Sequence, residues 1–590
     1  MGPSVSIKLI GASRLFLYAA CRLSRRSPMN LVSRLFWMAV LGSCALSQQS
    51  GVVPRSPKAA IEGIVTKDPS GEPVKKVLVE LIAEDQKQGG DYTGTTGPDG
   101  GFRIQNILPG RYRLFAERTG FLDIDKHHGR SEGRVLTLRP GEDVRDLQIR
   151  LQAAAVLRGR VTDEDGDPLA GAEVSALRQT FATGHKHWEQ VGSERTNDLG
   201  EYRIANLPAG SVFVSVNPPP DFKNLIESAG AFGERRSPGA GDNGQATAYQ
   251  TTYYPGTSDR SQAMPIQLHA GDEFPANFSL TPGPSLSIRG QVVNLPPRTS
   301  ATIMLQSRDF RLVTSGTEMH KDGSFVIRDV SPGSYLLLAS VEGSAVPMTA
   351  RQPLEVSSSN VDGLRLSPQP GASVRGRLRV DSPGKRFDPD QVYLVLQPVD
   401  GQDDEVAIPG ASFSNLAHVA AGGEFVWSDV PPGNYYVQIL GNGSGANEDW
   451  FLKTVLSGTR DVGEQGITVS GGTVFLDLVA SANGAVVDGV VADSKDQAVA
   501  NAIVVAVPET GMRGRVDQYR QTVSDQNGHF SLRGIRGGTY TLFAWESVDG
   551  QAYFNPEFLK SYEGQGQALH LSEADRKTVQ LTVIAAGDEQ

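Results

Sequence analysis

The chain is poor in cysteine, in aromatic residues and in helical patterns. Its 590 residues include two cysteines, Cys21 and Cys44, and aromatic residues make up 7% of the sequence. Because both cysteines lie near the N-terminus, no disulfide framework can form in the remainder. The sequence also lacks a phosphate-binding glycine loop, a nucleophile elbow and a basic stripe. These absences exclude a disulfide-stapled scaffold and leave no motif that supports catalysis.

Outside the N-terminal segment, basic residues are fewer than acidic residues. Residues 1–44 contain six basic residues and no acidic residue, which leaves 50 basic against 66 acidic residues, a formal charge of −16, for the rest. A body of this charge disfavours nucleic acid and anionic lipid as partners. We therefore expect no nucleic-acid partner.

The N-terminal segment has the pattern of an export signal. After Met29, the basic Arg34 precedes an apolar run at residues 35–41. The run is long enough for the core of a signal peptide and too short for a transmembrane helix. We take Met29 as the true start and residues 1–47 as the signal segment, followed by a polar tether at residues 48–58. This pattern predicts an exported protein, located in the periplasm, at the outer membrane surface or in the medium.

Two processing routes fit the end of this segment. Leu41-Gly42-Ser43-Cys44 is similar to a bacterial lipobox, in which the cysteine is acylated and anchors the protein. Ala45-Leu46-Ser47 is similar to an ordinary signal-peptidase site of small residues. Contact with a membrane is expected solely through a lipid on Cys44, and both routes stay open.

One spacing pattern recurs five times along the rest of the chain. It consists of a glycine, an aromatic residue two positions later, and a second glycine eight positions after the aromatic residue. The five sets are Gly100, Phe102 and Gly110; Gly200, Tyr202 and Gly210; Gly323, Phe325 and Gly333; Gly423, Phe425 and Gly433; and Gly528, Phe530 and Gly538.

Alternating apolar and polar residues follow each aromatic residue, which is typical of a half-buried strand. We interpret each set as a β-hairpin. The first glycine follows Asp99, Asp322 or Asn527 in three of the sets, in a turn that accepts left-handed conformations. The second glycine supplies positive φ to a type II turn such as Pro109-Gly110.

Opening strands of the form apolar-x-Gly-x-apolar divide the chain into five copies. Short strands separated by turns rich in glycine (66 residues) and proline (35 residues) predict an all-β fold of five tandem antiparallel β-sandwiches. The predicted domains are copy one at 59–155, copy two at 156–284 with an insertion at 217–262, copy three at 285–371, copy four at 372–483 and copy five at 484–590.

Copy two resembles a known family. Its Gly159-Arg160-Val161, the turn motif from Asp163 to Val174, Gly200-Glu201-Tyr202 and Leu207-Pro208-Ala209-Gly210 are similar to the carboxypeptidase regulatory-like domain. The resemblance extends over residues 58–590 and implies a seven-stranded, transthyretin-like and immunoglobulin-like sandwich, grouped with carbohydrate-binding-like folds. It also implies a tandem-domain protein of bacteria and a non-catalytic role.

A zinc carboxypeptidase would need a His-x-x-Glu pair and a distant second histidine. His570 and Glu573 have the spacing of the pair, and 17 residues follow them. We therefore predict no catalytic residue, no cofactor and no enzymatic activity.

Two sets of residues remain as candidate sites. His185, His187 and Glu189 alternate along one stretch and would present three metal ligands on one strand face, although an exposed polar strand is the favoured interpretation. Tyr253 and Tyr254, in the insertion, would offer aromatic rings to a sugar.

Trp545 is a third aromatic candidate for ligand binding. It alternates with the inward residues of its strand, and the favoured alternative is burial beneath the following segment with Tyr553 and Phe554. The resulting hypothesis is a non-catalytic binding or adhesion protein of the bacterial envelope whose variable loops recognise a glycan or another envelope protein. A structural stalk or spacer is the alternative, and a metal-dependent enzyme is a remote one.

Overall fold

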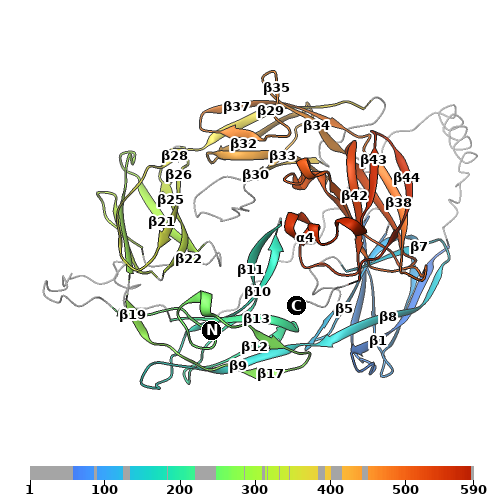
Figure 1. Ribbon diagram of the computed structural model, residues 1–590, viewed down its shortest axis with the longest axis horizontal. Coiled ribbons are helices and arrows are strands. Elements are labelled where there is room, and N and C mark those ends of the chain that lie inside the picture. The colour runs from blue at the N-terminus through green and yellow to red at the C-terminus, as the bar shows by residue number, and fades with distance from the viewer. Residues whose placement is uncertain are drawn as a thin grey trace, which may run out of the picture. The chain divides into compact units, whose positions relative to one another are not determined.

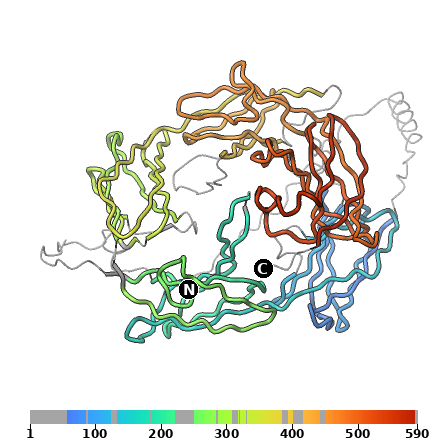
Figure 2. Tube along the Cα trace, viewed as in Figure 1, coloured from blue at the N-terminus to red at the C-terminus, as the bar shows by residue number. Residues whose placement is uncertain are grey.

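The computed structural model describes residues 57–85, 89–123, 133–182, 184–219, 247–284, 286–307, 313–314, 317–330, 332–344, 346–382, 392–399, 415–441 and 450–585. In these ranges the chain is nearly all β, as predicted from its alternating patterns (Figure 1). Each predicted copy is a continuous stretch of chain, so that its strands share one part of the colour range in Figure 2.

Copy one forms two four-stranded sheets, in the order β4-β1-β8-β6 and β3-β2-β5-β7. The strands are β1 (Ala59–Asp68), β2 (Leu78–Ala83), β3 (Tyr92–Thr95), β4 (Gly101–Ile107), β5 (Gly110–Glu117), β6 (Phe121–Asp123), β7 (Arg134–Leu138) and β8 (Asp143–Ala153). The short edge strand β6 gives one strand more than the predicted seven.

Copy two repeats this plan, with β12-β9-β17 as one sheet and β11-β10-β13-β15 as the other. Its elements are β9 (Ala155–Thr162), β10 (Glu173–Ala182), β11 (His185–Arg195), β12 (Glu201–Leu207), β13 (Gly210–Asn217), β14 (Thr247–Tyr249), β15 (Thr252–Tyr253), η1 (Arg260–Gln262), β16 (Ile266–Leu268), β17 (Glu273–Pro275), β18 (Phe278–Ser279) and β19 (Pro282–Pro284).

Copies three and four each pair a sheet of four strands with a sheet of five. Copy three contains β20 (Leu286–Val292), β21 (Ser300–Ser307), β22 (Val313–Thr314), β23 (Thr317–Met319), β24 (Ser324–Val330), β25 (Gly333–Glu342), β26 (Met348–Val356), β27 (Val361–Leu366) and β28 (Gln369–Pro370). Copy four contains β29 (Ala372–Val380), β30 (Val392–Pro398), β31 (Leu416–His418), β32 (Glu424–Val430), β33 (Gly433–Gly441), β34 (Phe451–Ser457), β35 (Arg460–Asp461), β36 (Ile467–Val469) and β37 (Thr473–Ser481).

Copy five adds short helices to the sheets β41-β38-β44 and β40-β39-β42-β43. Its elements are β38 (Ala485–Ala492), β39 (Ile503–Pro508), η3 (Thr510–Met512), η4 (Val516–Gln518), β40 (Arg520–Val523), β41 (His529–Ile535), β42 (Gly538–Trp545), η5 (Ala552–Phe554), α4 (Pro556–Lys560), η6 (Glu563–Gln565), β43 (Gln567–Leu571) and β44 (Arg576–Thr582). A separate cluster of buried apolar residues lies within each copy, between its two sheets.

The prediction that the two strands around the second glycine of each set pair as a β-hairpin is wrong. In copy one, β4 pairs with β1 whereas β5 pairs with β2 and β7, so the turn before Gly110 carries the chain from one sheet to the other. The equivalent strands separate in the same way in the other four copies. Alternation in the sequence shows which side chains face the core, and strands that cross between the two sheets of a sandwich have the same alternation as strands that pair.

Of the two glycines in each set that were predicted to have positive φ, the second has it in copy two but not in copies one, four and five. The first glycine of each set does have positive φ, between 73° and 89°. The second glycine has it in copy two, at Gly210, whereas Gly110, Gly433 and Gly538 have ordinary φ values. Positive φ occurs instead just before the last residue of the aromatic strand, at Asn106 (64°) and at its equivalents Asn206, Asp429 and Gly534. The pairing register shifts at this point, so these residues form a β-bulge.

The sandwiches are not wholly antiparallel. The opening strand of each copy pairs in parallel with a strand near the end of that copy, as β1 does with β8 and β38 with β44. The other pairs in copy one are antiparallel. A parallel pair needs a long connection, and here the whole body of the copy provides it.

Candidate functional site

The proposed metal ligands lie on one strand but do not form a cluster. His185, His187 and Glu189 are in β11, which pairs along its length with β10. His185 and Glu189 are exposed and His187 is half-buried. Within the described ranges, no group of three or more His, Cys, Asp or Glu side chains lies close enough to hold a metal ion.

The two tyrosines of the insertion contribute to copy two itself. Tyr254 packs edge-on against Phe274 and Phe278, with ring centroids 6.2 and 6.4 Å apart. Tyr253 pairs with Ser215 in the adjacent strand and is half-buried. Of this insertion the structure describes residues 217–219 and 247–262. Both tyrosines are half-buried, and Tyr254 packs against the core of copy two.

Trp545 is buried rather than exposed. Its exposed fraction is 1%, and its indole stacks on Phe543 with ring centroids 5.0 Å apart. Tyr553 and Phe558, from the helical segment that follows β42, lie over it and close a second core in copy five. This is the burial that the sequence favoured, and Trp545 offers no face to a sugar in this structure. Cys44 and the proposed signal segment lie outside the described residues.

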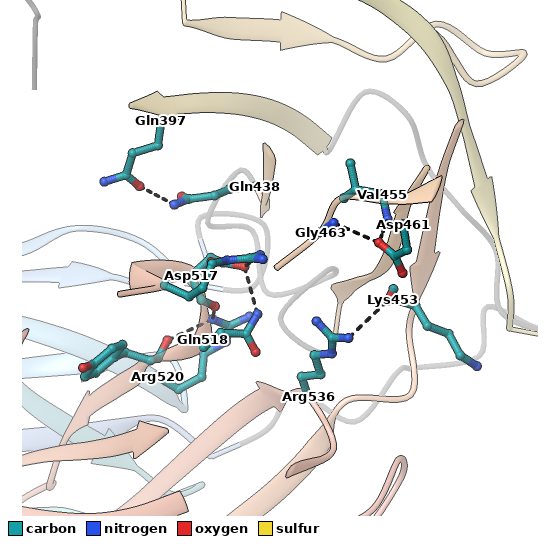
Figure 3. Close-up of polar contacts among 12 residues, drawn as sticks. Gln397, Gln438, Lys453, Val455, Asp461, Gly463, Asp517, Gln518, Arg520 and Arg536 are labelled. Carbon is teal, nitrogen blue, oxygen red and sulfur yellow. Dashed lines mark hydrogen bonds and ion pairs between the residues drawn. The ribbon is translucent and has the colours of Figure 1, made fainter. Parts of the chain in front are cut away.

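A cavity of about 230 Å³ lies where copy four meets copy five. Its walls come from β34 and the turn after β35 in copy four, and from two arginines of copy five. The lining residues are Leu452, Lys453, Thr454, Val455, Asp461, Gly463, Glu464, Gln465, Arg515 and Arg536. Figure 3 shows the polar contacts around it.

Direct contacts hold the two copies together beside the cavity. The carboxylate of Glu573 in copy five accepts hydrogen bonds from Ser481 Oγ at 2.6 Å and from Lys453 Nζ at 3.2 Å, both in copy four. The backbone N–H of Ala574 donates to the carbonyl of Asn483 at 2.7 Å. Lys453 also pairs with Asp381 at 2.9 Å, so its charge is already balanced by two carboxylates.

Arg515 is the most deeply buried charged group of the lining. Its side chain is 4% exposed, and its Nε and Nη2 donate to the two carboxylate oxygens of Asp517 at 2.7 and 2.6 Å. Its guanidinium lies over the ring of Tyr436 in copy four, 4.8 Å from the centroid. The remaining nitrogen, Nη1, is buried without a hydrogen-bond partner. A buried cationic donor in this state costs free energy unless a ligand or water satisfies it.

Arg536 faces the same space from the turn between β41 and β42. Its Nη2 donates to the backbone carbonyl of Lys453 at 3.4 Å, as Figure 3 shows. No carboxylate among the described residues pairs with it. In the other four copies, the equivalent position holds Leu108, Pro208, Ser331 or Pro431, so copy five alone places a charge there.

Hydrogen bonds from Arg520 to backbone carbonyls hold the loop that carries Arg515. Arg520 Nη1 donates to the carbonyls of Asp517 and Tyr519 at 2.6 and 2.9 Å, and Nε donates to that of Gly534 at 3.1 Å. Burial lowers the pKa of Arg520. The loop therefore holds Arg515 in place through backbone contacts that do not depend on any ligand.

The acidic residues of the lining differ in how far they are engaged. Asp461 Oδ1 accepts the N–H of Gly463 at 2.8 Å and that of Val455 at 3.4 Å (Figure 3). Glu464 is exposed at the edge. The site thus combines one arginine nitrogen without a hydrogen-bond partner, a second arginine and carboxylate acceptors, an arrangement suited to binding.

The sequence did not point to Arg515 or Arg536. The available signals were the segment 509–519, which has no counterpart of similar composition in the other copies, and the charge at position 536 of a repeated turn.

Among the described residues, no helix is long and apolar enough to span a membrane.

Comparison with known sequences gives a family match in the first two copies. Residues 60–152 and 156–220 match the carboxypeptidase regulatory-like domain. Carboxypeptidase D of Drosophila melanogaster is 25% identical over 173 residues, which cover 28% of this chain and 11% of that protein. The chain thus spans about a tenth of the length of this relative.

The solved structures that match this chain have low identity and low TM-scores. They include the TIE protein of Bacillus anthracis (TM-score 0.15, 10% identity, 53% of this chain and 51% of that chain) and the minor pilin GBS52 of Streptococcus agalactiae (0.19, 14%, 39% and 97%). BcpA, the major pilin subunit of Bacillus cereus, has a TM-score of 0.14 and 10% identity over 72% of this chain and 99% of that chain.

Proposed function

Because the chain carries two tandem carboxypeptidase regulatory-like domains, at residues 60–152 and 156–220, we propose that it is a non-catalytic, multi-domain binding protein of the bacterial cell envelope with a saccharide ligand. The matched family is the regulatory-like domain and not the zinc-dependent catalytic domain. The N-terminal apolar run at residues 35–41 supports export.

The observation that carries this proposal is the cavity between copies four and five. The five-fold repeated positions serve turns, bulges and cores, whereas Arg515 and Arg536 lie outside that shared pattern. A buried cationic side chain with one donor nitrogen that no neighbour satisfies, as Arg515 has, is typical of a binding site. Function in this chain therefore resides in what distinguishes one copy from the next.

A glycan array probed with the full chain tests the proposal. Binding to a defined set of neutral or acidic glycans supports it, and no binding to any glycan would rule out the saccharide ligand. Two variants separate the candidate places: Arg536→Gln alters the cavity, and Tyr253→Ala alters the insertion loop of copy two. Arg576→Gln, at an exposed position of copy five, is the matched control.

Anchoring is tested separately by labelling cells with a fatty-acid analogue. Label on the wild-type protein that is lost in Cys44→Ser supports a lipid anchor. An unlabelled wild-type protein supports cleavage after the signal segment instead.

The stalk alternative is less well supported. Copy five contacts copy two, although the two are not neighbours in sequence: Thr180 Oγ1 donates to Asp549 at 2.9 Å, and Asn555 Nδ2 donates to the carbonyl of Gly184 at 2.7 Å. Phe181 of copy two packs against the second core of copy five. A spacer made of independent modules would not need contacts between distant copies.

A further inference from the structure

We propose that the cavity between copies four and five binds the carboxylate of an acidic sugar, a hexuronate, between the guanidinium groups of Arg515 and Arg536. This inference rests on the proposed function and names the class of ligand at that same site. It also identifies the two residues that recognise the charged group.

The first step is the unsatisfied donor. Arg515, a lining residue of the cavity, uses two of its three nitrogens on Asp517 and its face on Tyr436, and its Nη1 is buried without a hydrogen-bond partner. Because Asp517 and Tyr436 already fix the guanidinium, little side-chain freedom remains to be lost when a ligand binds. An oxygen with negative charge is the strongest partner for such a donor.

The second step is the neighbouring charge. Arg536 lines the same cavity and has the 3.4 Å contact with the Lys453 carbonyl as its polar contact within the described ranges. Lys453, the third cation of the lining, is already paired with Asp381 and Glu573. Arg515 is paired with Asp517 at 2.6 Å, so Arg536 is the cation of the lining that no described carboxylate neutralises.

The third step is the chemistry of the remaining wall. Asp461, Glu464, Gln465 and Thr454 place oxygen acceptors around the two arginines. These acceptors form hydrogen bonds with hydroxyl groups, which a sugar offers and a sulfate dianion does not. A ligand with one carboxylate and several hydroxyl groups satisfies both kinds of lining.

The fourth step is size. A volume of about 230 Å³ is below the range of about 300–1,000 Å³ that is usual for drug-sized ligands. It suits one small ring rather than a chain of rings. A terminal uronate of a longer glycan fits if the rest of the glycan leaves through the open side.

Titration of the full chain tests the inference, with glucuronate, glucose and inorganic sulfate as separate probes. We expect glucuronate to bind, glucose to bind at least about 10-fold more weakly, and sulfate not to compete at equal concentration. Arg536→Gln should weaken glucuronate binding about 10-fold or more. Its melting temperature should be the same as that of the control variant Arg576→Gln. Arg536 is the better target because replacing Arg515 would also remove the two hydrogen bonds that it donates to Asp517.

The outcomes distinguish failure of the uronate site from failure of the proposed saccharide-binding function. Glucuronate binding that Arg536→Gln abolishes supports both. Binding of neutral glycans on the array, with no response to glucuronate or with loss in Tyr253→Ala instead, overturns the uronate site and leaves a saccharide-binding protein. Sulfate binding as tightly as glucuronate overturns the carboxylate assignment.

Discussion

Gly489 in β38 lies directly opposite Phe530 in β41. The same pairing recurs in the other copies, between Gly63 and Phe102, Gly159 and Tyr202, Gly290 and Phe325, and Gly376 and Phe425. A Cβ atom at position 489 would lie 2.3 Å from the carbonyl oxygen of Val579 in β44 and 2.6 Å from the Phe530 ring. The glycine is required because the aromatic ring covers it and the parallel strand approaches it closely.

Replacing this glycine should therefore destabilise copy five. We expect Gly489→Ala to cost about 1–3 kcal/mol, the range for overpacking a core. Gly511→Ala is the matched control, because no atom lies within 4 Å of a Cβ built there. Hydrogen exchange of peptides from residues 485–492 measures the effect within one copy, and equal exchange in both variants would contradict it.

Two of the repeated features could be read from sequence alone because they are local. The first glycine of each set has the expected positive φ, since a short turn between strands imposes it whatever surrounds the turn. The apolar residues that alternate after each aromatic residue, such as Ile104 and Leu114, are buried as expected. These properties depend on residues a few positions apart.

Other features depend on contacts between distant segments, which no local pattern contains. The turn before Gly110 could join two paired strands or two sheets, and the choice is made by where β1 and β2 lie. The cavity likewise requires Lys453, Arg515 and Arg536 to meet, although they are far apart in sequence. The location of Arg515 was therefore not predictable from its neighbours.

The buried tyrosines should make the protein sensitive to alkaline pH. Tyr112 donates its hydroxyl to the carbonyl of Leu108 at 2.6 Å, and burial, with the hydroxyl of Tyr92 nearby, raises the pKa of Tyr112 from 10.0 to about 12. Burial raises the pKa of Tyr540 to about 12 as well. In the unfolded chain these groups ionise near pH 10, before they do so in the folded protein.

The contribution of these tyrosines to the free energy of unfolding should thus be fully present below pH 10. It should fall as the pH rises from 10 to about 12, because the unfolded state loses its protons first. Tyr112→Phe should cost about 0.5–1.5 kcal/mol below pH 10 through the lost hydrogen bond, and should flatten the decline above it. Denaturation by urea at a series of pH values measures both. An unchanged slope in Tyr112→Phe would contradict the role given to this hydroxyl.

Trp545 should be important for stability rather than for binding. It is 1% exposed within the second core of copy five. We expect Trp545→Ala to destabilise copy five by about 3–5 kcal/mol. Phe475→Ala, at a side chain that is 64% exposed, should change stability by no more than about 0.5 kcal/mol. Loss of ligand binding in Trp545→Ala with unchanged stability would contradict this account.

The contact between copies two and five should protect the β10–β11 hairpin. Asp549 accepts hydrogen bonds from Thr180 Oγ1 at 2.9 Å and from Arg178 Nη2 at 3.5 Å. Asp549→Ala should speed hydrogen exchange in peptides from residues 178–190 by about 5- to 10-fold. Glu557→Ala, whose carboxylate pairs with Lys560 at the surface, is the control. Equal exchange in the two variants would show that the contact does not stabilise the hairpin.

The most direct test of the central claim is a crystal structure of the full chain grown with glucuronate. The account predicts electron density for one sugar ring in the cavity, with its carboxylate in contact with Arg515 Nη1 and with Arg536. Density for the sugar at another place, or a cavity that holds water alone while the sugar is bound in solution, would contradict it.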